Sequence, residues 1–260
     1  MNRIAKAFAG GKAFIPFVTA GDPSADKTVE YILEMEKAGA DLIELGIPFS
    51  DPTAEGPVIQ AANLRALRGG MTTDGAFGIV EKVRQSSRIP LVFLTYLNPV
   101  FHYGYEAFFA RCEAAGVDGI IIPDLPYEEK DEVARVAQPH GVHVISLVAP
   151  TSEQRIQAIA GAAGGFLYVV SSMGVTGVRS EIKTDLASIL AAVKQATHVP
   201  AAVGFGINTP EQAEAIARIA DGVIVGSAIV KLIEAHGDHA AQPVADYVRT
   251  MKAAVRRAET

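Results

Sequence analysis

Three carboxylates at the end of one apolar run are the strongest chemical signal in the chain. Glu44 lies inside the run Asp41-Leu-Ile-Glu-Leu-Gly46, where a charged side chain is unusual. Asp51 and Glu55 follow in a loop that also contains several prolines. Charged side chains are rarely buried without a partner or a chemical task. The segment therefore predicts an acid–base site.

Glu44 is the first candidate for a general acid or base. The residue pattern leaves its direction open, but we expect it to point into the interior at the strand's end, where desolvation raises a carboxyl pKa. The structural alternative is an ion pair with a buried Lys or Arg, and none of the other predicted strands contains one. For Asp51 and Glu55 the alternative is a plain turn, because Asp, Pro and Gly favour turns.

The elements that position these acids are short β-rich runs that alternate with helical patterns. Most of the runs are continuously apolar, which is typical of strands buried on both faces of a parallel sheet. The predicted strands are 13–19, 42–46, 91–95, 119–122, 143–148, 166–170, 200–203 and 222–225.

Several helices have readable boundaries. The segments Thr151–Gln154 and Thr209–Gln212 both have the pattern of a capping box, and Ser24 is placed to cap a third helix. We also expect a helix at the N-terminus, an extra helix near 60–67 and a last helix over about 244–257.

Eight βα units in a chain of 260 residues match a (β/α)₈ TIM barrel, an α/β fold. The alternative is an open, doubly wound sheet, which the count of eight strands and the lack of a Gly-x-Gly-x-x-Gly turn after the first strand disfavour. We expect residues 1–260 to form a single barrel domain with a long loop after its second strand.

Glycines end the last two predicted strands, in Gly204-Phe-Gly206 and Gly226-Ser227. TIM barrels often bind a phosphate there, at backbone N–H groups and the start of a short helix. The long segment 171–182 follows the sixth strand, and we interpret it either as a lid or as a plain surface loop.

Composition excludes several classes of protein. The net charge of −6 disfavours nucleic-acid binding, and the single cysteine, Cys112, excludes an internal disulfide and a cysteine-based zinc cluster. The six histidines show no metal-binding spacing, so we expect no metal. No signal-peptide pattern or membrane-length apolar run is present. The cytoplasm is the expected location.

Several motifs, in order along the chain, resemble the tryptophan synthase alpha subunit family. The most specific is Pro48-Phe-Ser-Asp-Pro52, in the loop after the second strand. The others are Phe17-Val-Thr-Ala-Gly-Asp-Pro23, Ile122-Pro-Asp-Leu-Pro126, Gly174-Val-Thr-Gly177, Gly204-Phe-Gly-Ile207 and Gly226-Ser-Ala-Ile-Val-Lys231.

The resemblance implies a lyase that cleaves indole-3-glycerol phosphate to indole and glyceraldehyde 3-phosphate. Glu44 would shuttle protons, and Glu55 would accept from the indole N–H. The resemblance further implies an indole pocket, formed by Phe17, Leu94, Tyr96 and Tyr168, and a phosphate site, formed by Gly177, Gly206, Gly226 and Ser227. It also implies that Thr176 belongs to a lid that closes against Asp124 or Glu55. Asp51 would face the partner subunit.

The resemblance also implies a beta subunit that receives the indole in an α₂β₂ tetramer. Pyridoxal phosphate is expected in that partner, and no cofactor in this chain. The chain departs from the family at Glu55, where the family pattern has Asp, and at Thr53, where it has Leu. A misplacement of about 1 Å can slow catalysis about a hundredfold.

Three other functions are alternatives to this lyase. A catalytically weak chain could act mainly as an allosteric activator of the beta subunit. A stand-alone lyase would release indole without that partner. A different phosphate-binding barrel enzyme fits the fold but not the loop after the second strand, and fold alone does not determine function.

Overall fold

Eight parallel strands close into a barrel in sequence order in the computed structural model, which describes residues 2–171, 185–204 and 206–259. The last strand pairs with the first, with Ala13 opposite Gly222, and this pairing completes the ring. The strands are β1 (Ala13–Thr19), β2 (Ile43–Gly46), β3 (Leu91–Leu94), β4 (Gly119–Ile121), β5 (His143–Val148), β6 (Leu167–Val170), β7 (Ala201–Gly204) and β8 (Gly222–Val225). The predicted TIM barrel is confirmed, and the doubly wound alternative is wrong.

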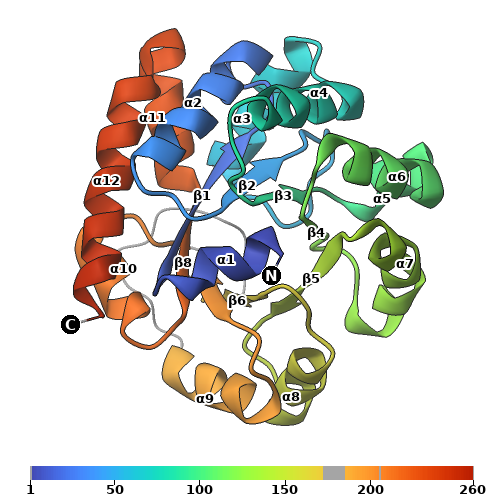
Figure 1. The fold of residues 1–260 in the computed structure, drawn as a ribbon, viewed down its shortest axis with the longest axis vertical. Helices are drawn as coiled ribbons and strands as arrows, with labels where there is room; N and C mark the ends of the chain where they lie inside the picture. The colour runs from blue at the N-terminus through green and yellow to red at the C-terminus, as the bar shows by residue number, and fades with distance from the viewer. Residues whose placement is uncertain (1, 172–184, 205, 260) are drawn as a thin grey trace.

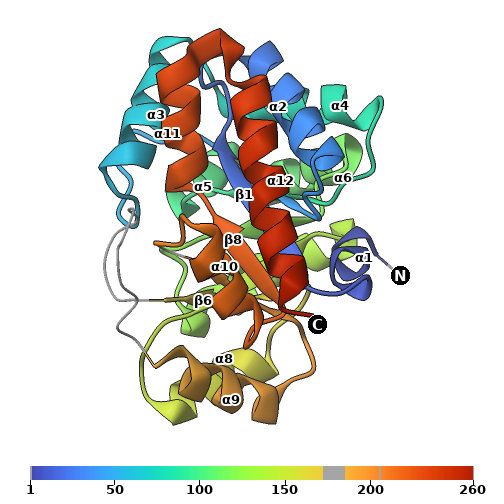
Figure 2. The same ribbon diagram turned by 90° about the vertical axis from the view of Figure 1, so that its left-hand side faces the viewer.

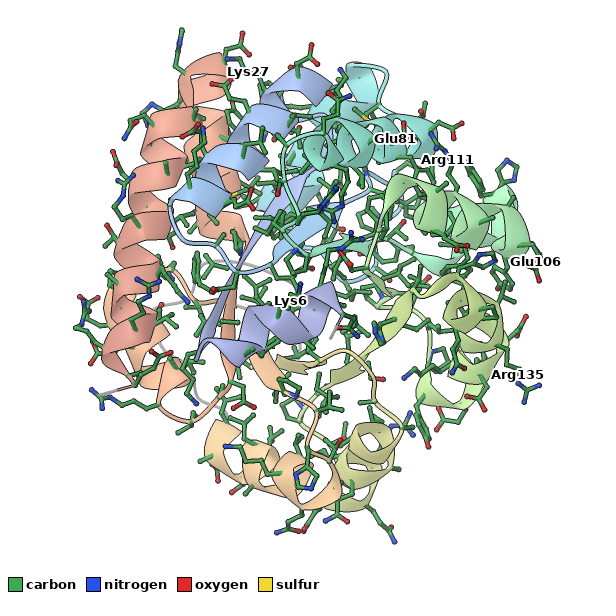
Figure 3. All side chains as sticks on the ribbon, viewed as in Figure 1. Lys6, Lys27, Glu81, Glu106, Arg111 and Arg135 are labelled. Carbon is green, nitrogen blue, oxygen red and sulfur yellow. The ribbon has the colours of Figure 1, made fainter. Side chains whose placement is uncertain are left out.

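A ring of helices surrounds the barrel, and Figure 1 looks along the barrel into that ring. The labelled side chains Glu106 and Arg135 point outward from its rim, whereas Glu81 of one helix lies beside Arg111 of a neighbouring helix (Figure 3). The helices are α1 (Arg3–Ala9), α2 (Ala25–Lys37), α3 (Pro57–Arg68), α4 (Thr73–Arg84), α5 (Leu97–Tyr103), α6 (Tyr105–Ala115), α7 (Lys130–Ala137), α8 (Glu153–Gly161), α9 (Leu186–Ala196), α10 (Pro210–Ala217), α11 (Ser227–His236) and α12 (Ala241–Arg257).

The apolar strands bury two separate layers because successive side chains point to opposite faces. In β1, Phe14 and Val18 pack outward against the helices, whereas Ala13 and Ile15 belong to the cluster that fills the barrel. Cys112 is buried in the outer layer, as its helical pattern predicts.

Helix α1 closes the end of the barrel at which the strands begin. Ile4 is fully buried among the interior side chains, and the Phe8 ring lies 5.8 Å from that of Phe166. The helix crosses this end in Figure 1 and lies far from α3 in Figure 2. The barrel is therefore sealed at one end, and a ligand can enter only at the other.

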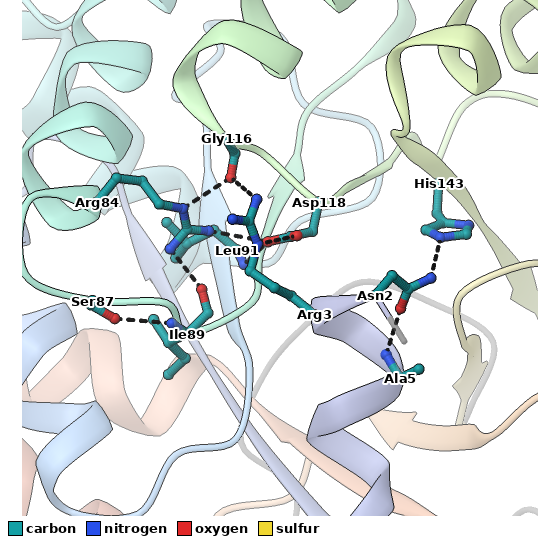
Figure 4. Close-up of polar contacts among 10 residues, drawn as sticks. All are labelled: Asn2, Arg3, Ala5, Arg84, Ser87, Ile89, Leu91, Gly116, Asp118 and His143. Carbon is teal, nitrogen blue, oxygen red and sulfur yellow. Dashed lines mark hydrogen bonds and ion pairs between the residues drawn. The ribbon is translucent and has the colours of Figure 1, made fainter.

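Charged side chains next to α1 form a network of hydrogen bonds and ion pairs (Figure 4). Asp118 stands just before β4; its Oδ1 accepts from Arg3 Nε at 2.6 Å, and its Oδ2 accepts from Arg84 Nη2 at 3.1 Å. The same carboxylate accepts from the Leu91 N–H at 2.9 Å, at the start of β3. The network joins the N-terminal helix to two neighbouring strands.

The predicted element boundaries were mostly right, with one wrong helix cap. The capping box of Thr209 and Gln212 is present, and Ser24 caps α2. The other predicted box is wrong: Ser152, not Thr151, caps α8 through its hydroxyl, which accepts from the Arg155 N–H. Adjacent Thr and Ser offer two equivalent hydroxyls, and sequence alone does not select between them.

Candidate active site

Glu44 points into the barrel near the C-terminal end of β2. The residue two positions earlier, Leu42, belongs to the interior cluster, whereas Leu45 packs outward. Alternation along the strand therefore sends the Glu44 side chain inward. It lies opposite Phe17 in the register of β1 and β2, and it is only 2% exposed.

The surroundings of Glu44 favour its neutral form. Burial is the main cause that raises its pKa to about 8, and the negative charge of Glu55 adds to the rise. Within the described ranges, no lysine or arginine forms an ion pair with this carboxyl group. The structural explanation, a buried salt bridge, therefore does not account for Glu44.

Glu55 lies just before α3 and is also buried, at 6% exposure. Burial raises its pKa to about 7, but hydrogen bonds from Asn63 and from the Tyr96 hydroxyl oppose that rise. The Asn63 amide donates to Glu55 Oε2 at 2.6 Å. The two neighbouring carboxyl groups thus differ in environment, because Glu55 has polar donors that stabilise its charge.

Two aromatic rings stand beside Glu44 because glycines on neighbouring strands leave room for them. A Cβ on Gly46 would lie 2.7 Å from the Phe17 ring, and a Cβ on Gly204 would lie 2.2 Å from the Tyr168 hydroxyl oxygen. Burial and the nearby charge of Glu44 raise the pKa of Tyr168 well above its ordinary value, so its hydroxyl stays neutral. Gly204 therefore makes space for an aromatic ring, a role that its sequence motif did not indicate.

The remaining predicted pocket residues line the same end of the barrel. Leu94, at the end of β3, packs against the cluster that contains Phe17, Ile59 and Val230. The Tyr96 hydroxyl accepts from the Ala54 N–H at 3.1 Å and so ties the long loop to the end of β3. Phe17, Leu94 and Tyr96 thus surround the two acids.

Asp124 and Asp51 lie at the margin of this end and are both exposed. Asp124 Oδ1 accepts from the Leu97 N–H at 2.9 Å, at the start of α5. The Asp51 carboxylate accepts from the hydroxyl of Ser50. Asp124 therefore orders the loop beside Tyr96, whereas Asp51 faces outward.

Three of the four residues predicted for the phosphate site follow the neighbouring strands β7 and β8. Gly226 is the N-cap of α11 and Ser227 its first residue, with the last strand directly before them. Gly206 has a φ of 82°, which a residue with a side chain rarely adopts. Thr176 and Gly177 lie outside the described residues.

Sequence reasoning missed Asn63 and the anchoring of the helix that carries it. Asn63 lies on α3 and is 3% exposed, facing Glu55. Arg65, on the same helix, donates from Nε and Nη2 to the two oxygens of Asp22, at 2.9 and 2.8 Å. The signal for Asn63 was a polar residue on the buried face of the predicted extra helix.

The arrangement can carry acid–base chemistry on a flat apolar ligand. Aromatic and aliphatic walls surround a neutral carboxyl group and a charged one, whose raised pKa values lie near neutral pH. The described residues contain no group of three or more His, Cys, Asp or Glu side chains that could hold a metal ion.

Comparison with known proteins identifies the family of the chain. The family described as "Tryptophan synthase alpha chain" matches residues 5–257. The tryptophan synthase alpha chain of Lacticaseibacillus casei is 51% identical over 98% of this chain and 96% of its own length. The alignment therefore covers nearly the whole of both proteins.

Solved structures show the same likeness. Tryptophan synthase subunit alpha of Legionella pneumophila has a TM-score of 0.90 and 40% identity over 99% of each chain. A chain from the α₂β₂ tryptophan synthase complex of Pyrococcus furiosus has a TM-score of 0.86 and 37% identity, over 94% of this chain and 99% of that one. The chain belongs to the tryptophan synthase alpha chain family.

Proposed function

We propose that Glu44 and Glu55 carry the lyase reaction of this family in the present chain. As a family member the chain cleaves indole-3-glycerol phosphate to indole and glyceraldehyde 3-phosphate. The observation that supports these two residues is a pair of buried carboxyl groups at the open end of the barrel, with raised pKa values and no ion pair to a Lys or Arg of the described chain.

Glu44 is proposed as the proton shuttle. At pH 7 it is mostly protonated, because its pKa is raised to about 8, and it can donate that proton to the ring carbon that bears the side chain. The resulting carboxylate then accepts the proton of the side-chain hydroxyl. The carbon–carbon bond breaks, its electron pair returns to the ring, and an aldehyde forms. Glu44 ends the cycle protonated, as it began.

Glu55 is proposed to stabilise the positive charge that the ring gains on protonation. Its carboxylate would accept from the indole N–H and so oppose the charge on the ring nitrogen. This role needs the ionised form, which the donors Asn63 and Tyr96 favour. Phe17, Leu94 and Tyr168 would hold the ring between the two acids.

The phosphate group is proposed to bind at the N-terminus of α11. The backbone N–H groups at the start of this helix, at Gly226 and Ser227, have the orientation that suits an anion. The positive φ of Gly206 allows a second stretch of backbone to approach it. Thr176 and Gly177 stay predictions of the sequence for the same end of the molecule.

A beta subunit is the proposed partner, in an α₂β₂ tetramer. The Pyrococcus furiosus relative belongs to such a complex. In the present chain, Phe101 of α5 is 67% exposed, unusually so for an aromatic ring, and Asp51 is exposed in the loop after β2. Both follow C-terminal ends of strands, so they lie on the face through which indole must leave. Pyridoxal phosphate would be the partner's cofactor.

No helix among the described residues is long and apolar enough to span a membrane. The cytoplasmic location and the single domain over residues 1–260 stay predictions of the sequence.

Indole release from indole-3-glycerol phosphate by the purified chain, with and without a beta subunit, tests the proposed residues. Glu44→Gln is the blank. We expect release that the beta subunit stimulates and that the blank loses. Release no greater than in the blank, with the beta activity still enhanced, would instead support the alternative of an allosteric activator.

A further inference from the structure

The Glu55 carboxylate is held by two neutral donors. Asn63 Nδ2 donates to Oε2 at 2.6 Å, and the Tyr96 hydroxyl forms a second hydrogen bond. No lysine or arginine in the described ranges pairs with it. A carboxylate has about four acceptor positions, so two donors leave room for a ligand N–H.

Three features hold α3, the helix that carries Asn63, in place. Its first residue is Pro57, which sets the helical backbone at the start, and Ile59 and Ala62 are buried beneath it. Arg65 binds Asp22 through two hydrogen bonds and donates to Glu234 of α11 at 2.8 Å. These contacts fix the position of the Asn63 backbone beside Glu55.

We propose that Asn63 is a positioning residue that holds the Glu55 carboxylate in its charged form and aims it at the indole N–H. The inference rests on the proposed role of Glu55. It explains how this chain uses a glutamate where the family pattern has an aspartate: the carboxylate of the longer side chain is held at its end by the α3 amide.

The direction of the hydrogen bond determines the expected effect. Asn63 donates, and a donor stabilises the charged carboxylate, so its removal raises the pKa of Glu55. The other titratable groups that face Glu55 are Glu44 from β2 and Tyr96 at the start of α5, with Asp124 near the Tyr96 hydroxyl. Neither the charge of Glu44 nor that of Asp124 would replace the lost donor.

The test compares Asn63→Leu with Gln60→Leu. Gln60 lies on the same helix, and its amide donates at 2.7 Å to the backbone oxygen of Glu55 rather than to the carboxylate. Infrared pH titration follows the carboxyl C=O band that is lost in Glu55→Gln, in the protein without substrate. The midpoint of this titration is the pKa of Glu55. We expect Asn63→Leu to raise the midpoint by about one pH unit and Gln60→Leu to leave it unchanged.

The pH profile of indole release then tests the link to catalysis. In Asn63→Leu we expect the acidic limb to move upward by the same shift, with kcat about fivefold lower at pH 7, about tenfold lower well below pH 7, and KM nearly unchanged. The deficit should shrink as pH rises. A structural role alone would lower the rate equally at every pH.

Two results would overturn the inference. One is an infrared midpoint that stays, which would mean that Asn63 does not stabilise the charged form, or that falls, which would mean that Asn63 presents its carbonyl oxygen to a protonated Glu55. The other is a raised midpoint with an unchanged acidic limb. If wild type released no indole at any pH, the proposed role of Glu55 would fail, and the infrared result would still test the hydrogen bond. Asn63→Ala serves the same test if Asn63→Leu does not fold.

Discussion

Three aspartates at the closed end of the barrel and two glutamates at its open end have opposite environments. At the end closed by α1, aspartates stand just before three strands, and each accepts an N–H at the start of a neighbouring strand: Asp41 from Phe14, Asp118 from Leu91 and Asp221 from Ala201. Each also pairs with a cation, as Figure 4 shows for Asp118. At the open end, Glu44 and Glu55 have no such cation among the described residues.

The two environments suit two different roles: the paired aspartates contribute to stability, and the two glutamates can carry out acid–base chemistry. A carboxylate that has backbone donors and a cation is neutralised, and it holds neighbouring strands in register. A carboxyl group buried without a cation keeps a raised pKa and can exchange its proton near neutral pH. The three aspartates therefore join the strands at the closed end, whereas Glu44 and Glu55 stay reactive at the open end at a cost in stability.

Removing the acid at the open end should have the largest effect on activity. Glu44→Gln keeps the shape of the side chain but cannot accept or return a proton. We expect kcat/KM for indole release to fall by about 10³-fold, within the range for general acid–base catalysis. Indole formation measured at saturating beta subunit checks this. A loss of less than about tenfold would assign the proton transfer to another group.

Removing an acid at the closed end should affect stability instead. Asp118→Ala leaves the Arg84 guanidinium, whose side chain is 9% exposed, without its carboxylate. Breaking a buried pair in this way costs about 3–5 kcal/mol of unfolding free energy. Urea unfolding measures it, with Asp221→Ala as the matched control, since the Asp221 side chain is 37% exposed and should lose less.

The activity of that variant completes the comparison. Folded Asp118→Ala should retain nearly the wild-type rate per active molecule, because Asp118 lies at the opposite end from Glu44. Equal stability of the Asp118 and Asp221 variants, or a lyase defect in folded Asp118→Ala, would contradict the division between the two ends.

The pH dependence of stability should also differ between the ends. Burial raises the pKa of Glu44 to about 8 from an ordinary value of 4.5, so the folded state binds this proton more tightly than the unfolded state. The stability that protonated Glu44 contributes to the folded state is therefore fully present below pH 4.5 and is lost as pH rises toward 8. Relative to wild type, Glu44→Gln should gain stability over this window, on the order of a few kcal/mol.

Unfolding free energies of the two proteins from pH 4.5 to 8.5 measure that gain. The difference should grow with pH and level off above 8. A constant difference would mean that Glu44 is already ionised in the folded protein, and that the open end is compensated like the closed one.

The comparison also shows what the sequence could predict. The strands were predictable because buried parallel strands are continuously apolar, and a Glu inside such a run stands out against that pattern. Glu44 was therefore identified from its surroundings in the sequence alone. The helix caps were predictable where one hydroxyl stood alone, as at Thr209, and not where two were adjacent, as at Thr151.

Other features depend on contacts between distant segments. Nothing in the local sequence connects Asn63 with Glu55, because the link needs the turn between them and the exact start of α3. Gly204 resembled a phosphate-binding glycine, yet it makes room for the Tyr168 ring on the neighbouring strand. The pairing of Asp118 with Arg3 likewise needs the N-terminal helix to fold across the barrel.

Shortening the second acid at the open end should have the smallest effect of the series. Glu55→Asp restores the family's residue but withdraws the carboxylate by one methylene from Asn63 and from the Tyr96 hydroxyl. Because both donors stand where the longer side chain ends, we expect kcat/KM to fall by about 10- to 100-fold. Restoring Leu at Thr53 in the same protein tests whether the loop can adjust. A shortened variant as active as wild type would show that the loop, and not α3, sets the position of the acid.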